Sequence, residues 1–401
     1  MNQKVLFVHL LRLGDVLMLL PSIMRFRKSY PKAEIHLLLN DNCSILSSII
    51  ERYVDKIHYF QRDLIQQEIV DPNANLFSPY YQIESFIKQL NNESFDYVVN
   101  FTQNYLSAYI CSLIDAEQKE GMIYEDAEIV IKGEAFKNIN KQENDSNIEK
   151  SHFIDAFFQA LNLNSPNVEN WKFLGLNSQI QKPYILFQTH TNEEIKTLSS
   201  IQWVNLFENM KPFLHDFEIR VLCAPNEEEK TQSMLSLLDH EIQDSLYIHP
   251  CSFSKALELI EDASLLVTVD TSIKHLSNFT STRVLELSLG SSDINRTGIY
   301  KEGAFIFQPT VSCLPCSHSK GCTKNEHLCA NSINLDSFAT LIFSLAKDPL
   351  SIQQVFPELE LNGNLYSVFN TDCKFNIKNI LEHNNKINDQ SDIGDTHESN
   401  T

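Results

Sequence analysis

The sequence is poor in glycine and in basic residues, and it lacks a long uninterrupted hydrophobic run. Only 10 of its 401 residues are glycine and 43% are hydrophobic, which is typical of a globular protein and argues against disorder over most of the chain. Asp and Glu outnumber Lys and Arg by 52 to 32, giving a formal net charge of −20. Such an acidic chain is a poor candidate for binding nucleic acid or for electrostatic docking to anionic lipid.

No segment offers the roughly 18 consecutive apolar residues that a membrane-spanning helix needs. The apolar N-terminal region is interrupted by Lys4, His9, Arg12 and Asp15, and it has no small-residue cleavage site. We therefore expect a cytoplasmic protein whose membrane contact is at most peripheral, at the inner face of the cytoplasmic membrane.

Apolar strand patterns alternate with helical patterns along most of the chain, and its length suits two domains of ordinary size. Strands are predicted at 5–10, 35–39, 95–101, 184–188, 219–222, 247–249, 265–269 and 284–287, and helices at 16–29 and 152–161. This alternation predicts an α/β protein with two doubly wound parallel sheets.

The remaining segments are more polar. Residues 117–151 are rich in acids, Lys and Asn and are predicted to form a surface excursion, and residues 162–170 form the predicted linker. The domains are therefore expected at 1–170 and 171–345, followed by an extension over 346–379 and a disordered tail over 380–401. Within the extension, Asn362-Gly363-Asn364 between two apolar segments predicts a hairpin.

A short polar turn follows the first predicted strand, in Arg12-Leu-Gly14-Asp15-Val-Leu. Gly14 suits a sharp bend, and Asp15 lies where a helix N-cap belongs. Because chemistry in open α/β sheets collects at the carboxyl ends of strands, Asp15 is also a candidate general base. This segment alone does not separate the two roles.

A second turn of this kind follows the strand predicted at 265–269 and holds Asp270, Thr271, Ser272 and His275. Hydroxyl groups and free backbone N–H groups at a helix start form an anion site. His275 follows about one helical turn later and can face the same ligand. Each residue alone is more often a cap or a buried core histidine, but the two turns together suggest a cleft between two domains.

The first turn resembles the start of glycosyltransferase family 9, the heptosyltransferases that build lipopolysaccharide inner core. The segment Val269-Asp270-Thr271-Ser272…His275 is similar to the phosphate loop of that family, and Ala224-Pro225-Asn226-Glu227 to its nucleoside-binding turn. These motifs occur in the same order as in the family, along residues 1–345.

The resemblance implies a GT-B fold, with two Rossmann-like domains facing across a cleft, and an inverting glycosyltransferase. It implies a nucleotide-diphosphate donor such as ADP-heptose, and as acceptor a hydroxyl of a lipopolysaccharide core, another surface glycan, a glycolipid or a protein. Asp15 would be the general base, with His275 and Lys196 stabilising the leaving nucleotide. The implied substrate-binding residues are Gly14, Thr191, Glu227, Asp270, Thr271 and Ser272. No catalytic cofactor is expected.

Two positions depart from the family pattern. Ser272 stands where the family usually has glycine. Lys196 precedes Trp203 by seven residues, whereas the family's lysine lies closer to its tryptophan. The alternative for Lys196 is a solvated surface lysine. These departures keep open a degenerate scaffold that binds a nucleotide sugar or a partner without transfer. The nearest enzymatic alternative is a GT-B hydrolase or epimerase.

Four of the nine cysteines cluster within the loop 313–329, at Cys313, Cys316, Cys322 and Cys329. A C-x₂-C pair followed by two further thiols fits a structural Zn or Fe site with four sulfur ligands. Reduced packing thiols and disulfides are the alternatives, although disulfides are rare in a reducing cytoplasm. Cysteine-rich loops at this place also resemble those of many family 9 members.

Overall fold

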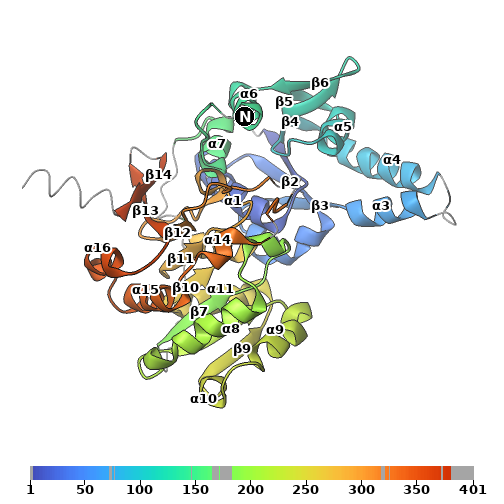
Figure 1. The fold of residues 1–401 in the computed structure, drawn as a ribbon. Coiled ribbons are helices and arrows are strands. Elements are labelled where there is room, and N and C mark those ends of the chain that lie inside the picture. The colour runs from blue at the N-terminus through green and yellow to red at the C-terminus, as the bar shows by residue number, and fades with distance from the viewer. Residues whose placement is uncertain are drawn as a thin grey trace, which may run out of the picture. The chain divides into compact units, whose positions relative to one another are not determined.

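The computed structural model describes residues 3–71, 75, 77–145, 147–164, 171, 183–317, 321–324, 326–371 and 374–380. The chain divides into two compact units, residues 1–166 and 167–401 (Figure 1). The predicted tail over 380–401, apart from residue 380, and most of the predicted linker lie outside the described residues. Among the helices that are described, none is long and apolar enough to cross a membrane.

Unit 1 is built on one mixed sheet with the strand order β3-β2-β1-β4-β5-β6. Neighbouring strands from β3 to β5 run parallel, and β6 is antiparallel to β5. Its strands are β1 (Lys4–His9), β2 (Glu34–Asn40), β3 (Lys56–Phe60), β4 (Phe95–Asn100), β5 (Ala116–Glu125) and β6 (Glu128–Lys132). Its helices are α1 (Leu13–Ser29), α2 (Ser47–Ile50), α3 (Arg62–Val70), α4 (Ser78–Asn91), α5 (Tyr105–Leu113), α6 (Glu134–Asn144) and α7 (Phe153–Ala160), with a 3₁₀ turn η1 (Asp41–Leu46).

Unit 2 is built on a larger sheet with the order β14-β13-β12-β11-β10-β7-β8-β9. Its strands are β7 (Tyr184–Gln188), β8 (Glu218–Cys223), β9 (Leu246–Pro250), β10 (Leu265–Thr268), β11 (Val284–Leu287), β12 (Phe305–Pro309), β13 (Gly363–Thr371) and β14 (Lys374–Asn379). Strands β7 to β12 form the parallel part, and β13 and β14 add an antiparallel hairpin to its edge.

Helices surround the sheet of unit 2 in the same alternating pattern. They are α8 (Ser200–Asn209), α9 (Glu228–Leu235), α10 (His240–Gln243), α11 (Phe253–Asp262), α12 (Ser272–Leu276), α13 (Ile294–Thr297), α14 (Leu328–Asn331), α15 (Leu335–Lys347) and α16 (Ile352–Val355). Short 3₁₀ turns include η3 (Glu194–Lys196), η5 (Pro225–Glu227) and η8 (Phe356–Glu358). The core is continuous from the sheet to α8 and α15, with Trp203, Phe207 and Phe338 buried in it.

Both parallel sheets have the doubly wound strand order, so the predicted fold class is confirmed. In unit 1 the order reverses between β1 and β4, and in unit 2 between β7 and β10. These are the switch points where open α/β sheets bind ligands, at the carboxyl ends of the strands. The predicted apolar strands form because their side chains are fully buried, as in β1 and β10.

Two predictions about the polar segments are wrong. Residues 117–151 are not a surface excursion, since β5 and β6 continue the sheet of unit 1 and α6 follows them. The hairpin exists but is displaced, because its strands are β13 and β14, whereas the segment 356–361 contains the 3₁₀ turn η8. Gly363 belongs to a strand, and a β-carbon there would lie 2.5 Å from the Phe307 ring.

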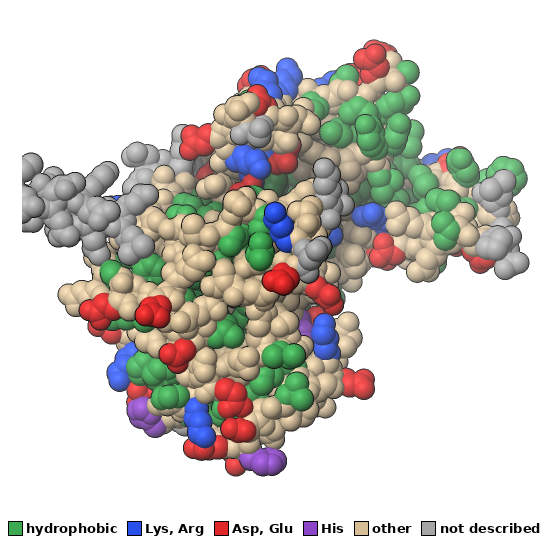
Figure 2. Space-filling model, in the orientation of Figure 1, with side chains coloured by type: hydrophobic (Ala, Val, Ile, Leu, Met, Phe, Trp, Pro, Cys, Tyr) green, Lys and Arg blue, Asp and Glu red, His purple; other side chains and the backbone are tan. Residues whose placement is uncertain are grey.

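Hydrophobic side chains are exposed over helices α4 and α5 of unit 1 (Figure 2). Tyr80 and Tyr81 on α4 are 72% and 65% exposed, and Tyr105 and Tyr109 on α5 are 70% and 45% exposed.

Candidate active site

The first candidate turn lies at the switch point of unit 1, directly after β1. Asp15 is half-buried, and its Oδ2 accepts a hydrogen bond from the backbone N–H of Arg12 at 3.1 Å. Helix α1 begins at Leu13 with Arg12 as its N-cap, so Asp15 is the third helical residue and not the predicted N-cap. From this position it still caps the helix, through its bond to the Arg12 N–H. Gly14 lies in the first helical turn and is not among the glycines with positive φ, so the predicted sharp bend is also absent there.

A polar network that was not predicted from the sequence lies at the same switch point, at the end of β4. The Asn100 amide at the end of β4 donates to Ser107 Oγ and to the Met122 carbonyl, and accepts from the Thr102 N–H. Thr102 Oγ1 in turn accepts from the Leu10 N–H at 2.8 Å. The network therefore joins the carboxyl ends of β1 and β4, and it fixes the backbone that leads into the Gly14–Asp15 turn.

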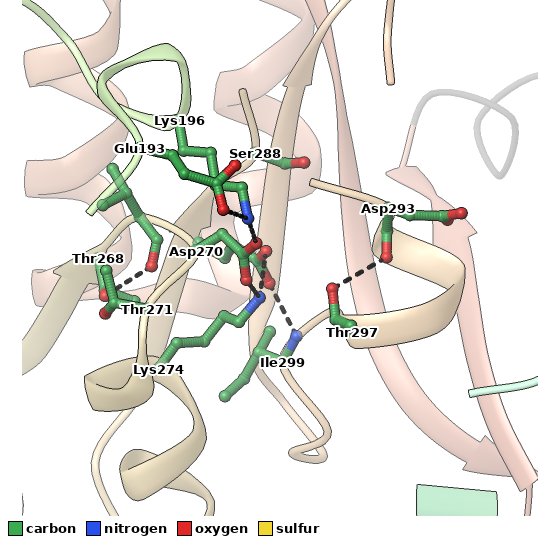
Figure 3. Close-up of polar contacts among 12 residues, drawn as sticks. Glu193, Lys196, Thr268, Asp270, Thr271, Lys274, Ser288, Asp293, Thr297 and Ile299 are labelled. Atoms are coloured by element: carbon green, nitrogen blue, oxygen red, sulfur yellow. Dashed lines mark hydrogen bonds and ion pairs between the residues drawn. The ribbon is translucent and has the colours of Figure 1, made fainter. Parts of the chain in front are cut away.

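In unit 2 the second candidate turn lies at the switch point between β7 and β10. Asp270 Oδ2 accepts from Lys196 Nζ at 3.0 Å (Figure 3). Lys196 lies on η3 after β7, is only 7% exposed and also lies 3.5 Å from Glu193 Oε1. The alternative of a solvated surface lysine is therefore wrong, because this ammonium group is buried against the carboxylate at the switch point.

Lys274 and Glu286 extend this pair into a buried network that was not predicted. Lys274 Nζ donates to Asp270 Oδ1 at 2.6 Å and to Glu286 Oε1 at 2.9 Å, and its side chain is fully buried. Glu286 Oε2 accepts from the Ile299 N–H at 2.7 Å. Lys274 follows Asp270 by four residues, a spacing that on an exposed helix would indicate a surface ion pair.

Burial and charge act in opposite directions on these groups. Burial alone would raise the pKa of Asp270, but the ammonium groups of Lys274 and Lys196 outweigh it and hold that pKa well below its usual range. Burial would lower the pKa of Lys274, whereas the carboxylates of Asp270 and Glu286 raise it. Asp270 and Lys274 are therefore charged at neutral pH, and the Asp270 carboxylate fixes the side chains of both lysines at the end of β10.

The hydroxyl residues of the turn lie beside this network. Thr271 is the N-cap of α12, and its Oγ1 donates to Gln188 Oε1 on β7 at 3.2 Å. Ser272 begins the helix and is half-buried. His275 is 4% exposed and close enough to Asp270 that its charge lowers the Asp270 pKa. The structure thus brings Lys196, Asp270, Thr271 and His275 together at the end of β10.

The predicted nucleoside turn also lies at the carboxyl end of the sheet, after β8. Glu227 Oε2 accepts from the Ala224 N–H at 2.9 Å, which closes the turn η5. Thr191 Oγ1 accepts from the Glu193 N–H at 3.4 Å in the segment after β7. Between them, His190 Nε2 lies 2.8 Å from Thr231 Oγ1, which donates to the Glu227 carbonyl. A buried contact therefore links the two turns.

The four clustered cysteines form one neighbourhood in unit 2. Burial raises the pKa of Cys316, and the neighbouring thiols of Cys313, Cys322 and Cys329 raise it further. All four are free thiols. Although all four residues are described, no three of their sulfur atoms lie within 4.8 Å of one another. A structural metal at this loop is therefore a proposal that rests on the spacing of the four thiols in the sequence.

The cysteine loop is anchored on the segment that carries Lys196. His327 Nε2 lies 2.8 Å from the Ile195 carbonyl, and the Cys316 N–H donates to the Gly290 carbonyl at 2.7 Å. Gly290 has a φ of +61°, and a β-carbon there would lie 2.1 Å from the same Ile195 carbonyl. This close approach explains the glycine and joins the loop to η3.

Hydroxyl and backbone donors at a helix start, with lysines nearby, are groups of the type that can bind a phosphate anion. Preorganised cations and hydroxyl groups in a water-poor site stabilise charge that develops on a departing phosphate. The carboxylate on the β1 turn of unit 1 is of the type that removes a proton from a hydroxyl group.

The comparisons with known proteins show the family and the fold. The family model of glycosyltransferase family 9 (heptosyltransferase) matches residues 83–327, more than half of the chain. No curated protein matches the sequence. The fold is similar to the E. coli heptosyltransferase WaaC with ADP, with a TM-score of 0.57 and 17% identity over 75% of this chain and 91% of that one.

Two further solved structures share the fold. The E. coli ADP-heptose lps heptosyltransferase II has a TM-score of 0.60 and 13% identity, over 86% of this chain and 98% of that one. A family 9 glycosyl transferase from Veillonella parvula has a TM-score of 0.54 and 13% identity, over 76% and 86%. The chain therefore belongs to glycosyltransferase family 9, the heptosyltransferases, and is a glycosyltransferase of the GT-B fold.

Proposed function

We propose that this protein is an inverting glycosyltransferase that moves heptose from ADP-heptose to a hydroxyl group of a lipopolysaccharide core, another surface glycan or a protein. The observation that carries the proposal is the buried Lys196–Asp270 pair, 3.0 Å apart, at the switch point of unit 2. It holds an ammonium group beside the Thr271–Ser272 turn, where a diphosphate has hydroxyl and backbone donors.

On the donor side, Lys196 and His275 stabilise the charge that appears on the diphosphate as the bond to the sugar breaks. The Thr271 hydroxyl and the backbone of Ser272 bind a phosphate oxygen. Asp270 acts as a positioning residue, because each of its oxygens holds one lysine. Glu227 binds a ribose hydroxyl or the base edge, and Thr191 binds the same nucleotide from the neighbouring turn.

On the acceptor side, Asp15 removes the proton from the attacking hydroxyl group. The oxygen then attacks the anomeric carbon, the bond to the diphosphate breaks, and the nucleoside diphosphate leaves with the bonding electrons. A single displacement of this kind inverts the anomeric centre. General-base assistance is typically worth ~10²–10⁴ in rate.

Cys313, Cys316, Cys322 and Cys329 are proposed to hold a structural Zn or Fe ion. An ion with four thiolate ligands has no open position for substrate and contributes to folding rather than to the reaction. Within unit 2, the role that follows from the His327 and Gly290 contacts is to hold the Lys196 segment in place.

The test is transfer itself. The purified protein is incubated with ADP-heptose and with acceptor glycans or proteins from cells that lack it, and the products are identified by mass spectrometry. A heptose added to one acceptor, with the anomeric configuration inverted, is the expected result. Free heptose or an epimerised donor would instead identify a hydrolase or an epimerase, and ADP-heptose binding without any product would identify a degenerate scaffold.

A further inference from the structure

Two histidines and two glutamates gather at the amino end of the unit 1 sheet, away from the strand ends that carry Asp15. His36 on β2 pairs in register with Lys56 on β3, so His58, two residues further, lies on the same face. Glu93 lies in the turn between α4 and β4, close to the start of β4. None of these side chains takes part in the proposed transfer reaction.

The ligand atoms of His36, His58 and Glu93 converge. One nitrogen of each histidine and one carboxylate oxygen of Glu93 all lie within 4.8 Å of one another. His36 Nδ1 is 3.0 Å from His58 Nε2. Two nitrogens on one tetrahedral Zn²⁺ ion are about 3.3 Å apart, because each Zn–N bond is about 2.0–2.1 Å. A small separation of the two rings is therefore enough to admit an ion.

Glu34 orients the buried imidazole. His36 Nε2 lies 2.9 Å from Glu34 Oε1, so the proton belongs on Nε2 and the Nδ1 lone pair faces His58. A carboxylate on the far nitrogen of a histidine is the usual second contact of metal-binding imidazoles. The ring of Phe95 lies edge-on to both histidines.

Two lysines compete with a cation at this place. Lys4 Nζ lies 2.9 Å from Glu34 and 3.5 Å from Glu93, and Lys56 is paired with the other oxygen of Glu93. The Lys56 side chain is 51% exposed, whereas that of Glu93 is 20% exposed. Lys56 can therefore swing into solvent and release the carboxylate without leaving a buried charge behind.

We propose that His36, His58 and Glu93 form a binding site for a divalent transition-metal ion of the Zn²⁺ type, with Glu34 orienting His36. Three protein ligands leave a fourth tetrahedral position for water. The site lies in unit 1 and has nitrogen and oxygen donors, so it is chemically distinct from the thiol cluster of unit 2.

The test measures Zn²⁺ binding to the full chain by equilibrium dialysis over buffered Zn²⁺ concentrations. His58→Gln is expected to bind one Zn²⁺ ion fewer per chain than the wild type. Glu93→Gln is expected to lower the affinity for that ion at least tenfold. Lys56→Gln is expected to tighten it, because a competing cation is removed. Glu84→Gln is the control, since this carboxylate on α4 is 56% exposed and pairs only with Lys88 among the contacts described.

Equal stoichiometry and affinity in the wild type, His58→Gln and Glu93→Gln would overturn the proposal. Thermal unfolding without added Zn²⁺ checks that each variant is folded. If His58→Gln does not fold, the variants at the exposed Lys56 and the partly exposed Glu93 still test the proposal. A metal site requires Lys56→Gln to raise the Zn²⁺ affinity and Glu93→Gln to lower it. Effects of the same sign, or none, would identify a plain hydrogen-bonded cluster.

Discussion

The ammonium group of Lys274 lies 2.6 Å from Asp270 Oδ1, and its side chain is completely buried. The opposite oxygen of the same carboxylate faces Lys196. Asp270 is thus held from both sides, and neither of its oxygens can rotate without breaking an ion pair. This arrangement fixes the turn on which the proposed diphosphate site depends.

Lys274→Met should destabilise the protein by about 3–5 kcal/mol, because it removes the cation that pairs with the buried Glu286 and leaves Asp270 with Lys196 alone. The free energy of unfolding in urea measures this. Lys347→Met is the matched control, since Lys347 is 60% exposed and pairs with Asp216 at the surface, where such pairs contribute about 0–1 kcal/mol. Equal effects of the two substitutions would contradict the structural role of Lys274.

Thr271→Val and His275→Ala should each weaken the binding of ADP, because each removes a donor from the proposed anion site. A loss of about 1.5–3 kcal/mol per charged or charge-assisted contact corresponds to roughly a 10–150-fold higher Kd. Isothermal titration with ADP measures it, with the exposed Ser236→Ala as the control. Unchanged affinity in both variants would place the diphosphate elsewhere.

Asp15→Asn should lower kcat by ~10²–10⁴ while the affinity for ADP stays near that of the wild type. An asparagine oxygen can still accept the Arg12 N–H, so the start of α1 is retained and stability should change little. Asp63→Asn, an exposed carboxylate in the first turn of α3, controls for the loss of a charge at a helix start. A fully active Asp15→Asn protein would reject the role of general base.

Protein purified without added metal should contain Zn or Fe bound by the thiol cluster, and Cys316→Ser should lose about one equivalent per chain. Chelation should lower the melting temperature, because a closed site contributes its binding energy to folding. Elemental analysis and thermal unfolding measure the two effects, with Cys251→Ser as the control. If the wild-type protein is free of metal and all four thiols of this loop can be titrated, the cysteines are reduced packing residues and not metal ligands.

His9 on β1 should make the protein sensitive to acid. Burial lowers the pKa of His9 to about 3, and neither ring nitrogen has a hydrogen-bond partner among the described residues. The unfolded chain takes up a proton near pH 6.5 and the folded chain does not, so stability falls as the pH drops from about 6.5 towards 3, by up to about 1.4 kcal/mol per pH unit. His9→Leu should reduce this dependence of the unfolding free energy on pH, measured by urea unfolding at several pH values across the range. Identical slopes in both proteins would show that His9 does not contribute.

The strands whose side chains are buried on both faces, such as 5–10 and 265–269, could be predicted from the sequence. A short continuous apolar run is typical of a strand in the middle of a parallel sheet. Strand β5 was missed because Gly121 and Ile123 are its only fully buried residues, so its composition is that of a surface segment. The displaced hairpin has a similar cause. Asn-Gly-Asn is a strong turn signal, but pairing with β12 draws Gly363 into a strand.

At the site, the motif residues were predictable and their connections were not. Asp270, Thr271 and His275 lie close together in the sequence, so one turn reveals them. Lys196 precedes Asp270 by 74 residues, and only the adjacency of β7 and β10 brings the two side chains together. Glu286 depends in the same way on β11 lying next to β10. Such contacts follow from strand order, which local patterns do not specify.

The hairpin β13–β14 also determines where the chain can safely be shortened. It covers the outer edge of β12, whose residues 305–309 would otherwise present unpaired backbone groups along an almost fully buried apolar strand. Open edges of this kind recruit other chains. A version that stops before residue 363 would retain every proposed catalytic residue, yet we expect it to collect in the insoluble fraction during expression.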